Sequence, residues 1–395
     1  MGMRTALTGN EVVSLAMKQI EPEVVAGYPI TPQTDIIEEF SKFCANGEVN
    51  TELVLVESEH SSMSACIGAA AAGGRTMTAT SSQGLAFMWE MLYIASGMRL
   101  PIVMAVTNRA LSAPINIHCD HSDSMGARDS GWIQLYCRTA QEVYDSMIQA
   151  VRISEHPGVR LPVMINYDGF ITSHALVDVD TIEDKKVKEF IGEYKSIYPL
   201  LDVKNPVTYG SLDLFDYYME HKRQETQAML NALKVIKEVG KEFGESFGRR
   251  YNLLDSYRLE DAEIAVVALN STAMTAQVAA DEARDAGLKA GVLSIRSFRP
   301  FPKEKVAEKL RKLKAVCVLD RADSFGARGG PVGLEVKSAL FDYGINDVKV
   351  LNWVYGLGGR DVSCADIGTV FAVLSDVMRS GKVEKEFGYL GVRVE

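Results

Sequence analysis

Residues 101–109 read PIVMAVTNR, a continuous apolar run that ends in a threonine, an asparagine and an arginine. A strand with apolar side chains on both faces is typical of a parallel sheet that helices cover on both sides. Similar apolar runs precede and follow this one, and Ala- or Met-rich stretches at helical spacing lie between them. This alternation predicts an α/β fold built on an open, mostly parallel sheet.

The first domain is expected to span residues 1–190. Its predicted strands lie at 24–30, 76–82, 101–109 and 161–168, and its predicted helices at 59–73, 84–97 and 141–154. In an open α/β sheet of this kind, ligands bind beyond the carboxyl ends of the strands. The residues that follow these strands are therefore the first candidates for a functional site.

The pattern changes over residues 191–259, which we interpret as a connector. Its stretch at 219–247 is rich in charge and carries apolar residues at helical spacing, as in a surface helix with one buried stripe. A second open α/β domain is expected at 260–395. Its predicted strands lie at 262–270, 290–298, 315–320 and 348–354, and its helices at 271–287, 303–313, 331–344 and 365–380.

The composition excludes several classes of function. The 395 residues include 42 lysines and arginines against 52 aspartates and glutamates, for a net charge of −10, and no basic block. This balance argues against a nucleic-acid partner. No apolar run approaches the roughly 18 residues of a membrane span, and the start of the chain does not resemble a signal peptide, so we expect a soluble, cytoplasmic protein with no membrane partner.

The six cysteines are too far apart to form a cluster motif. The closest pair, Cys119 and Cys137, is separated by 18 positions. Zinc and iron–sulfur sites are usually built from cysteines two to four positions apart. We therefore expect no metal site in this chain, and interpret the cysteines as small, mostly buried apolar residues.

The turn after the first predicted strand, GYPITPQT at 27–34, is held by two prolines. Proline fixes φ and delays the start of the next helix, so Tyr28, Thr31 and Thr34 would present their hydroxyls rigidly at the carboxyl edge of the sheet. The alternative is an ordinary turn in which Thr34 caps the following helix.

Glu59 lies in the motif ESEH, directly before an Ala- and Gly-rich helix. Small side chains allow close packing around this carboxyl, and loss of solvent would raise its pKa, leaving a protonated acid that can donate to a ring nitrogen. The alternative is an acid that only complements the dipole of the helix N-terminus.

The loop that follows residues 101–109 is dense in polar side chains. Arg109 lies at the carboxyl end of the strand and could clamp a substrate carboxylate with its planar guanidinium. A metal site of His118, Asp120 and His121 is disfavoured because one short loop rarely supplies a closed ligand set. Ser-His-Asp hydrolysis is disfavoured because the chain has no Gly-x-Ser-x-Gly elbow.

Two Gly-rich turns, at 326–333 and 356–360, follow predicted strands of the second domain. Turns of this kind can admit a ligand or the backbone of another chain. We expect both turns to face neighbouring subunits.

Taken together, five segments are more specific than any one of them. These segments are YPITPQT, ESEH with its Ala-rich helix, TATSSQGLAFMWE, NRALSAPINIHCDHSD and INYDGFITSH. Together they resemble the alpha subunits of pyruvate:ferredoxin oxidoreductases, which are thiamine diphosphate-dependent 2-oxo acid:ferredoxin oxidoreductases. The resemblance covers the whole chain. It implies that the first domain is a pyrimidine-type thiamine diphosphate-binding domain and that the second is similar to the C-terminal domain of transketolases.

The resemblance also implies roles for individual residues. Glu59 would hydrogen-bond N1′ of the aminopyrimidine ring and act in catalysis, and Tyr28 and Pro29 would contact the same cofactor. Thr31 and Arg109 would hold the carboxylate of the 2-oxo acid.

A sixth residue, Ile117, would limit the pocket for the methyl group of the substrate. The implied reaction is the reversible, CoA-dependent oxidative decarboxylation of pyruvate to acetyl-CoA and CO₂, with electrons passing through iron–sulfur clusters to an external ferredoxin. The alternatives are the same chemistry on branched-chain 2-oxo acids such as 2-oxoisovalerate, or a non-catalytic α/β binding subunit.

Two features of the chain indicate that it supplies only part of an active site and that other subunits supply the rest. Its nearest match to a Gly-Asp-Gly motif for Mg²⁺ is Tyr167-Asp168-Gly169, which lacks the first glycine, and it has no grouped cysteines. The family resemblance implies a beta subunit that holds the diphosphate and Mg²⁺, a gamma subunit, and a ferredoxin-like subunit that holds the iron–sulfur clusters. Thiamine diphosphate would then be shared between the alpha and beta subunits.

Overall fold

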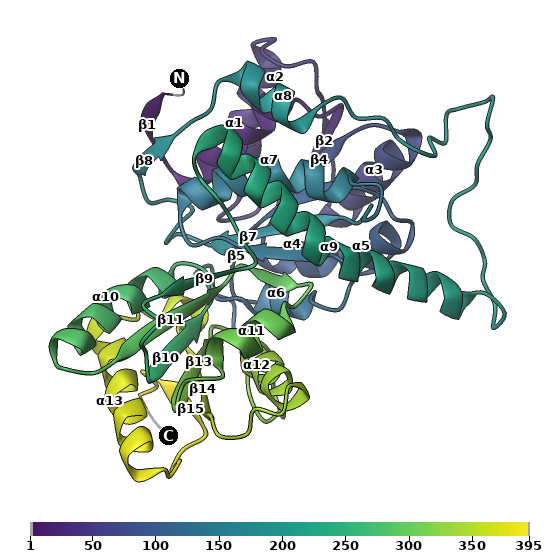
Figure 1. Ribbon diagram of the computed structural model, residues 1–395. Coiled ribbons are helices and arrows are strands. Elements are labelled where there is room, and N and C mark those ends of the chain that lie inside the picture. Colours follow the sequence, from purple (N-terminus) through teal and green to yellow (C-terminus); the bar gives the residue numbers. More distant parts are fainter. Residues whose placement is uncertain (1–2, 394–395) are drawn as a thin grey trace.

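A computed structural model describes residues 3–393 of the chain (Figure 1). It contains one seven-stranded sheet, one six-stranded sheet and a two-stranded ribbon. The two large sheets form separate lobes, each with helices on both faces, as the predicted α/β class requires. None of the helices within residues 3–393 has an apolar stretch long enough to cross a bilayer.

The seven-stranded sheet has the order β12-β6-β7-β5-β4-β2-β3, with β5 at its centre. Its strands are β2 (Val24–Gly27), β3 (Glu52–Leu55), β4 (Thr76–Thr80), β5 (Ile102–Asn108), β6 (Ile133–Tyr136), β7 (Val163–Asp168) and β12 (Ser297–Arg299). All neighbours run parallel except β12, which is antiparallel to β6. The helices of this lobe are α1 (Gly9–Ile20), α2 (Thr34–Ala45), α3 (Glu59–Ala72), α4 (Ser82–Phe87), α5 (Trp89–Gly97), α6 (Ser122–Gly126), α7 (Ala140–Glu155) and α8 (Asp184–Ile191).

Strand β5 explains why the apolar run at 101–109 is continuous. Its side chains alternate between two hydrophobic cores: Ile102, Met104 and Val106 pack with α3, α4 and α5, while Val103 and Ala105 pack with α1, α2 and α7. All seven residues of the strand are buried. The prediction of a parallel strand covered by helices on both faces is therefore confirmed.

The six-stranded sheet has the order β15-β14-β13-β10-β11-β9 and is parallel apart from β9. Its strands are β9 (Leu254–Tyr257), β10 (Ile264–Ala268), β11 (Ala290–Ile295), β13 (Ala315–Asp320), β14 (Lys349–Tyr355) and β15 (Phe387–Leu390). Its helices are α10 (Thr272–Asp285), α11 (Lys303–Leu310), α12 (Pro331–Asp342) and α13 (Cys364–Ser380), and one 3₁₀ turn, η1, spans Leu357–Gly359.

Two strands lie where sequence patterns did not place them. The run predicted as one strand at 290–298 divides into β11, in the second sheet, and β12, which pairs with the first sheet. Strand β9 comes from the stretch interpreted as a connector and pairs with β11. The domain boundaries after residues 190 and 259 stay predictions.

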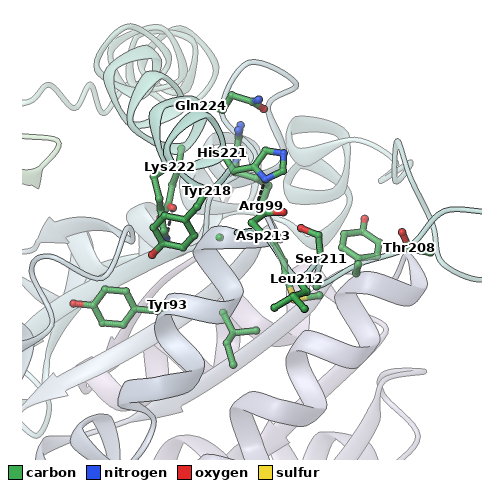
Figure 2. Close-up of a pocket in the computed structure, with 16 residues that line it drawn as sticks. Tyr93, Arg99, Thr208, Ser211, Leu212, Asp213, Tyr218, His221, Lys222 and Gln224 are labelled. Carbon is green, nitrogen blue, oxygen red and sulfur yellow. Dashed lines mark hydrogen bonds and ion pairs between the residues drawn. The ribbon is translucent and has the colours of Figure 1, made fainter. Parts of the chain in front are cut away.

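The connector contains the predicted charged helix, α9 (Tyr218–Phe247), which packs on α7. One stripe of it is buried, including Val235, Ile236 and Phe243, so the predicted surface helix with one buried face is confirmed. The chain before α9 extends away from the lobe as a long loop (Figure 1). This loop, α5 and the start of α9 line a cavity of about 680 Å³, in which His221 and Asp213 are hydrogen-bonded (Figure 2).

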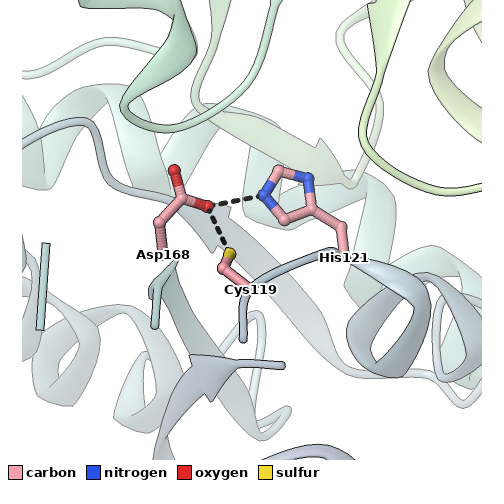
Figure 3. A group of neighbouring side chains, drawn as sticks. All are labelled: Cys119, His121 and Asp168. Atoms are coloured by element: carbon pink, nitrogen blue, oxygen red, sulfur yellow. Dashed lines mark hydrogen bonds and ion pairs between the residues drawn. The ribbon is translucent and has the colours of Figure 1, made fainter. Parts of the chain in front are cut away.

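The two lobes meet at the buried carboxylate of Asp168, at the end of β7. From the first lobe, His121 Nε2 lies 2.8 Å and the Cys119 thiol 3.3 Å from Oδ1 (Figure 3). From the second lobe, Asn270 Nδ2 donates to Oδ1, the backbone N–H of Ser271 donates to Oδ2, and Arg321 Nη1 lies 3.5 Å from Oδ2. Asp168 therefore joins the two lobes.

Burial by itself would raise the pKa of Asp168. The Arg321 guanidinium and the hydrogen bond from His121 outweigh burial and hold this pKa well below its usual range. The carboxylate is therefore ionised when the two lobes are docked, and it neutralises a buried arginine.

We expect Asp168→Ala to destabilise the chain by roughly 3–5 kcal/mol, because it leaves the Arg321 cation buried without its partner. Guanidinium denaturation of the chain would measure this loss. The matched control is Asp178→Ala, which removes an exposed ion pair with Arg4 and should cost less than about 1 kcal/mol. Equal losses for the two variants would contradict the role of Asp168 as the interlobe contact.

Candidate active site

The carboxyl ends of β2, β4, β5 and β7 lie at one edge of the first sheet, because these strands are parallel. The turn at 27–34 follows β2, Ser81 and Ser82 follow β4, and Arg109 follows β5. Glu59 reaches the same edge from the start of α3, since its Oε1 packs against Gly84 after β4. The strand order therefore brings these predicted site segments together at the carboxyl edge of the first sheet.

Glu59 begins helix α3, whose N-cap Ser58 accepts a hydrogen bond from the backbone N–H of Ser61. The Glu59 residue is only 7% exposed, and burial raises the pKa of its carboxyl, as the Ala-rich sequence around it led us to expect. Within residues 3–393 no other side chain donates a hydrogen bond to this carboxylate. A buried carboxyl that no other side chain stabilises is costly unless it is protonated or meets a ligand.

Gly84, in α4, leaves the space that this carboxyl occupies. A Cβ on Gly84 would lie 2.6 Å from Glu59 Oε1 and 2.5 Å from Thr80 Oγ1, so any side chain here would displace them. The hydroxyls of Thr80 and Ser81 are buried and have no hydrogen-bond partner within the described chain. Unpaired polar atoms beside a dry carboxyl fit a heterocycle that offers both a ring nitrogen acceptor and an amino donor, as an aminopyrimidine does.

Two aromatic rings in the segment 87–89 are exposed, and one of them lies near the start of α3. Phe87 is 57% exposed, and its ring centroid lies 6.2 Å from that of His60, the residue after Glu59. Trp89, at the start of α5, is 45% exposed. Single exposed apolar residues are ordinary, but two large rings exposed only two positions apart indicate a surface that another molecule covers. Sequence patterns did not single out these rings, because apolar residues at helical spacing are usually buried.

Arg109 bridges two loops of the site. Its Nη1 donates to the carbonyl of Thr31 at 2.9 Å, and its Nε donates to the carbonyl of Asn116 at 2.9 Å. Its Nη2 makes no hydrogen bond to the described residues. Burial lowers the pKa of Arg109, although a guanidinium stays charged at any physiological pH. The two carbonyls fix the plane of the guanidinium and leave Nη2 to bind an anion.

The turn at 27–34 is held from outside. Asn10 Nδ2 donates to the carbonyl of Pro32 at 2.7 Å, and the backbone N–H of Gln33 donates to the carbonyl of Ile30 at 2.7 Å. The N-cap of α2 is Gln33, with no side-chain capping bond, and Thr34 already lies inside the helix. The alternative in which Thr34 caps this helix was therefore wrong.

The structure brings the predicted residues together to different degrees. Thr31 and Arg109 are in contact, and Ile117, which is 44% exposed, follows the asparagine whose carbonyl Arg109 binds. Tyr28 is half-buried and Pro29 is exposed. Within the described chain no hydrogen bond joins these two residues to Glu59, and they reach the site only as neighbours of Thr31.

Asp123, in α6, joins the segments of the site, although no sequence motif points to it. It accepts hydrogen bonds from the backbone N–H groups of Ser82 (3.0 Å), Arg109 (3.0 Å) and Ser124 (2.7 Å), and from Asn108 Nδ2 (2.9 Å). Burial raises the pKa of Asp123 to about 6, although these donors pull it down. The sequence feature that could have pointed to Asp123 is its position in the loop after Arg109, which is dense in polar residues.

The Gly-rich turn at 356–360 lies against the loop that follows Arg109. The carbonyl of Gly358 accepts a hydrogen bond from Asn116 Nδ2 at 3.0 Å, and its N–H donates to Asp120 Oδ2 at 3.1 Å. The expectation that these glycines face a neighbouring subunit stays a prediction. In the other turn, Gly330 and Gly333 donate to Asn352 and Asp320 of their own lobe.

Cys119, His121 and Asp168 lie within 4.8 Å of one another and are buried (Figure 3). They do not resemble an open metal site, because Arg321 and donors from both lobes already surround the carboxylate. Burial also raises the pKa of Cys119 well above its usual value, so the thiol keeps its proton. His118, weighed above as a ligand, is exposed and contacts the ring of Phe170.

Comparison with known proteins identifies the family. A family model described as "Pyruvate flavodoxin/ferredoxin oxidoreductase, thiamine diP-bdg" matches residues 15–241, and one described as "Pyruvate:ferredoxin oxidoreductase core domain II" matches residues 262–367. The chain belongs to the pyruvate flavodoxin/ferredoxin oxidoreductase family. The resemblance inferred from the five sequence segments is thereby confirmed.

Relatives within this family align over almost the whole chain. Pyruvate synthase subunit PorA of Thermotoga maritima is 56% identical over 99% of this chain and 98% of its own, and that of Methanocaldococcus jannaschii is 49% identical over 92% and 93%. Ketoisovalerate oxidoreductase subunit VorA of Pyrococcus horikoshii is 42% identical over 97% of each chain.

Solved structures share the fold. The 2-oxoglutarate:ferredoxin oxidoreductase of Magnetococcus marinus superposes with a TM-score of 0.74 at 18% identity, covering 93% of this chain and 65% of that one. A split-gene transketolase superposes with a TM-score of 0.57 at 13% identity, covering 95% of this chain and all of its own. These likenesses confirm the predicted fold class for this member of the family.

We expect Asp123→Asn to remove a pH dependence of stability. The carboxyl ordinarily titrates near 3.8 but near 6 when folded, so between these values the folded state holds a proton that the unfolded chain has released. As the pH rises from about 4 to about 6, the free energy of unfolding of the wild type should fall relative to that of the variant by on the order of 3 kcal/mol. Urea denaturation at several pH values measures this difference, and a difference that is constant with pH would contradict it.

Proposed function

We propose that this chain is the alpha subunit of a multi-subunit pyruvate:ferredoxin oxidoreductase, which oxidises pyruvate with CoA to acetyl-CoA and CO₂ and passes electrons to ferredoxin. The observation that carries the proposal is the buried carboxyl of Glu59, to which no other side chain of residues 3–393 donates a hydrogen bond, within the region matched by the thiamine diphosphate-binding model. The pyruvate synthase subunits at 56% and 49% identity support pyruvate as the 2-oxo acid.

Glu59 has the geometry to hold a proton at a ring nitrogen. Its raised pKa keeps the carboxyl protonated to higher pH than an exposed glutamate, and Gly84 leaves room for a flat group beside it. Thiamine diphosphate, when bound, supplies the nucleophilic carbon that decarboxylation of a 2-oxo acid requires. Glu59 would donate to the aminopyrimidine ring, with Tyr28 and Pro29 beside the same ring.

Arg109 would bind the carboxylate of the acid. Thr31 and Asn116 hold the guanidinium by their backbone carbonyls, so the group does not need to reorient when substrate arrives. The free Nη2 presents its donors to the anion. Ile117, in the same loop, would contact the methyl group of pyruvate.

The partner subunits complete the site. Asp168, in the nearest match to a Mg²⁺ motif, already binds donors from both lobes, which supports a beta subunit as the holder of Mg²⁺ and the diphosphate. A gamma subunit and a ferredoxin-like subunit with the iron–sulfur clusters would complete the complex. Large apolar side chains exposed beside the site provide a surface for such a partner: Leu55, Phe87, Trp89, Ile115 and Ile117.

Branched-chain 2-oxo acids are the second candidate substrates, favoured by the 42% identity to a ketoisovalerate oxidoreductase subunit. One methylene in an apolar pocket changes discrimination by only about 1–3 kcal/mol, so pocket size separates these acids weakly. Measuring kcat/KM of the complex for pyruvate and for 2-oxoisovalerate decides between them. A higher value for 2-oxoisovalerate would replace pyruvate in the proposal.

We expect Glu59→Gln to lower turnover about 100-fold or more, since an amide cannot supply the acidic proton of the carboxyl. The assay is dye reduction by the assembled complex that depends on thiamine diphosphate and CoA. The matched control is Glu57→Gln, two residues away and exposed, which should keep its activity. Full turnover in Glu59→Gln would contradict the role of Glu59 as the proton donor to the ring.

We expect Arg109→Lys to lower kcat/KM for pyruvate roughly 10- to 100-fold, because lysine keeps the charge but loses the planar fork, whose charged hydrogen bonds contribute about 1.5–3 kcal/mol. Steady-state kinetics of the complex measures the loss, with Arg4→Lys on an exposed strand as the control. An unchanged kcat/KM would contradict the role of Arg109 as the carboxylate clamp.

A further inference from the structure

The strongest unexplained feature of the second lobe is the turn at 356–359, which follows β14 and reaches the first lobe. Gly358 has φ +60° and Gly359 has φ +80°, both in the left-handed region that favours glycine. A residue with a side chain would be strained at either position.

The turn fits against the 116–120 loop without room for a side chain. A Cβ on Gly358 would lie 2.5 Å from Asn116 Nδ2, and one on Gly359 would lie 2.3 Å from the Cβ of His118. Hydrogen bonds cross this contact in both directions, from Asn116 to Gly358 and from Gly358 to Asp120. The backbone of the turn therefore interlocks with the side chains of Asn116, His118 and Asp120.

The turn is itself anchored. The carbonyl of Gly356 accepts a hydrogen bond from Arg321 Nε at 3.3 Å, and the same arginine lies against Asp168. On the far side, Arg360 donates to the carbonyl of Gly391. The turn is thus fixed to the second lobe, and docking of the two lobes determines where it lies relative to the first lobe.

Asn116 connects this turn to the proposed substrate-binding arginine. Its backbone carbonyl accepts from Arg109 Nε, its side-chain Nδ2 donates to Gly358, and its Oδ1 accepts from the backbone N–H of His118. Within residues 3–393, the guanidinium donates only to the carbonyls of Asn116 and Thr31. If Asn116 moved, the guanidinium would keep its charge but lose its fixed plane.

We propose that the glycine turn at 356–359 is a positioning device for Arg109, which sets the orientation of the guanidinium toward the carboxylate of the 2-oxo acid by holding Asn116 in place. Gly358 and Asn116 are positioning residues, since they act through Arg109. The inference rests on the proposed function, because it assigns the second lobe a part in substrate binding at the same site.

Gly358→Ala in the assembled complex tests the proposal. The matched control is Gly344→Ala, a glycine of the same lobe with φ +66° and open space around it, so both variants carry the same backbone strain. We expect KM for pyruvate to rise tenfold or more in Gly358→Ala with kcat changed less than threefold, and neither constant to change more than twofold in Gly344→Ala. Equal effects of the two variants on KM would overturn the proposal.

A second variant decides the question if Gly358→Ala does not fold. Asn116→Ala removes the bond to Gly358 but keeps the backbone carbonyl that Arg109 binds, and it should raise KM for pyruvate in the same way. An unchanged KM in Asn116→Ala would overturn the proposal.

Hydrogen exchange separates this inference from the proposed function. In the full chain, the amides of residues 115–120 should exchange faster in Gly358→Ala than in Gly344→Ala, whatever the substrate. If the wild-type complex does not oxidise pyruvate, the proposed function fails, and faster exchange would still support the interlock. Equal exchange in the two variants would overturn it.

Discussion

The carboxylate of Asp168 receives hydrogen bonds from both lobes and lies against a buried arginine, and the geometry of the site depends on this contact. A buried charge is expensive unless it is paired and fully hydrogen-bonded. Here His121, Asn270 and Ser271 supply donors and Arg321 supplies the opposite charge. Because these groups come from both lobes, the charge is compensated only when the lobes are docked. The docked state also brings the glycine turn of the second lobe to the loop beside Arg109.

Burial has opposite consequences for two acids of this chain. Asp168 is surrounded by donors and a cation, so its pKa falls and it acts as a structural anion. Glu59 has no side-chain partner within the described residues, so burial raises its pKa and keeps a proton on it for longer. The difference lies in the partners, since both side chains are shielded from water. A proton donor and an interlobe contact can therefore be made from the same functional group.

Sequence patterns predicted much of the fold correctly. Continuous apolar runs such as 101–109 report burial on both faces, which is a local property, and nearly all the predicted strands and helices are present. The division of 290–298 between two sheets was missed, because which sheet a strand edge joins depends on docking rather than on its own residues. Glu59, Thr31 and Arg109 could be chosen by residue type and by their places in the motifs. Asp123 could not, since its role consists of collecting backbone N–H groups from distant segments.

What the sequence by itself determined was the α/β class, the order of strands and helices, the family, and which polar residues follow which strands. These depend on periodicity, composition and motifs, which can be read along the chain. Only the tertiary structure decided that Gly84 makes room for the carboxyl of Glu59, that two backbone carbonyls orient Arg109, and that Gly358 packs on Asn116. These are contacts between segments up to 242 positions apart in the chain. Such contacts depend on the space between packed backbones, and no local pattern of residues encodes that space.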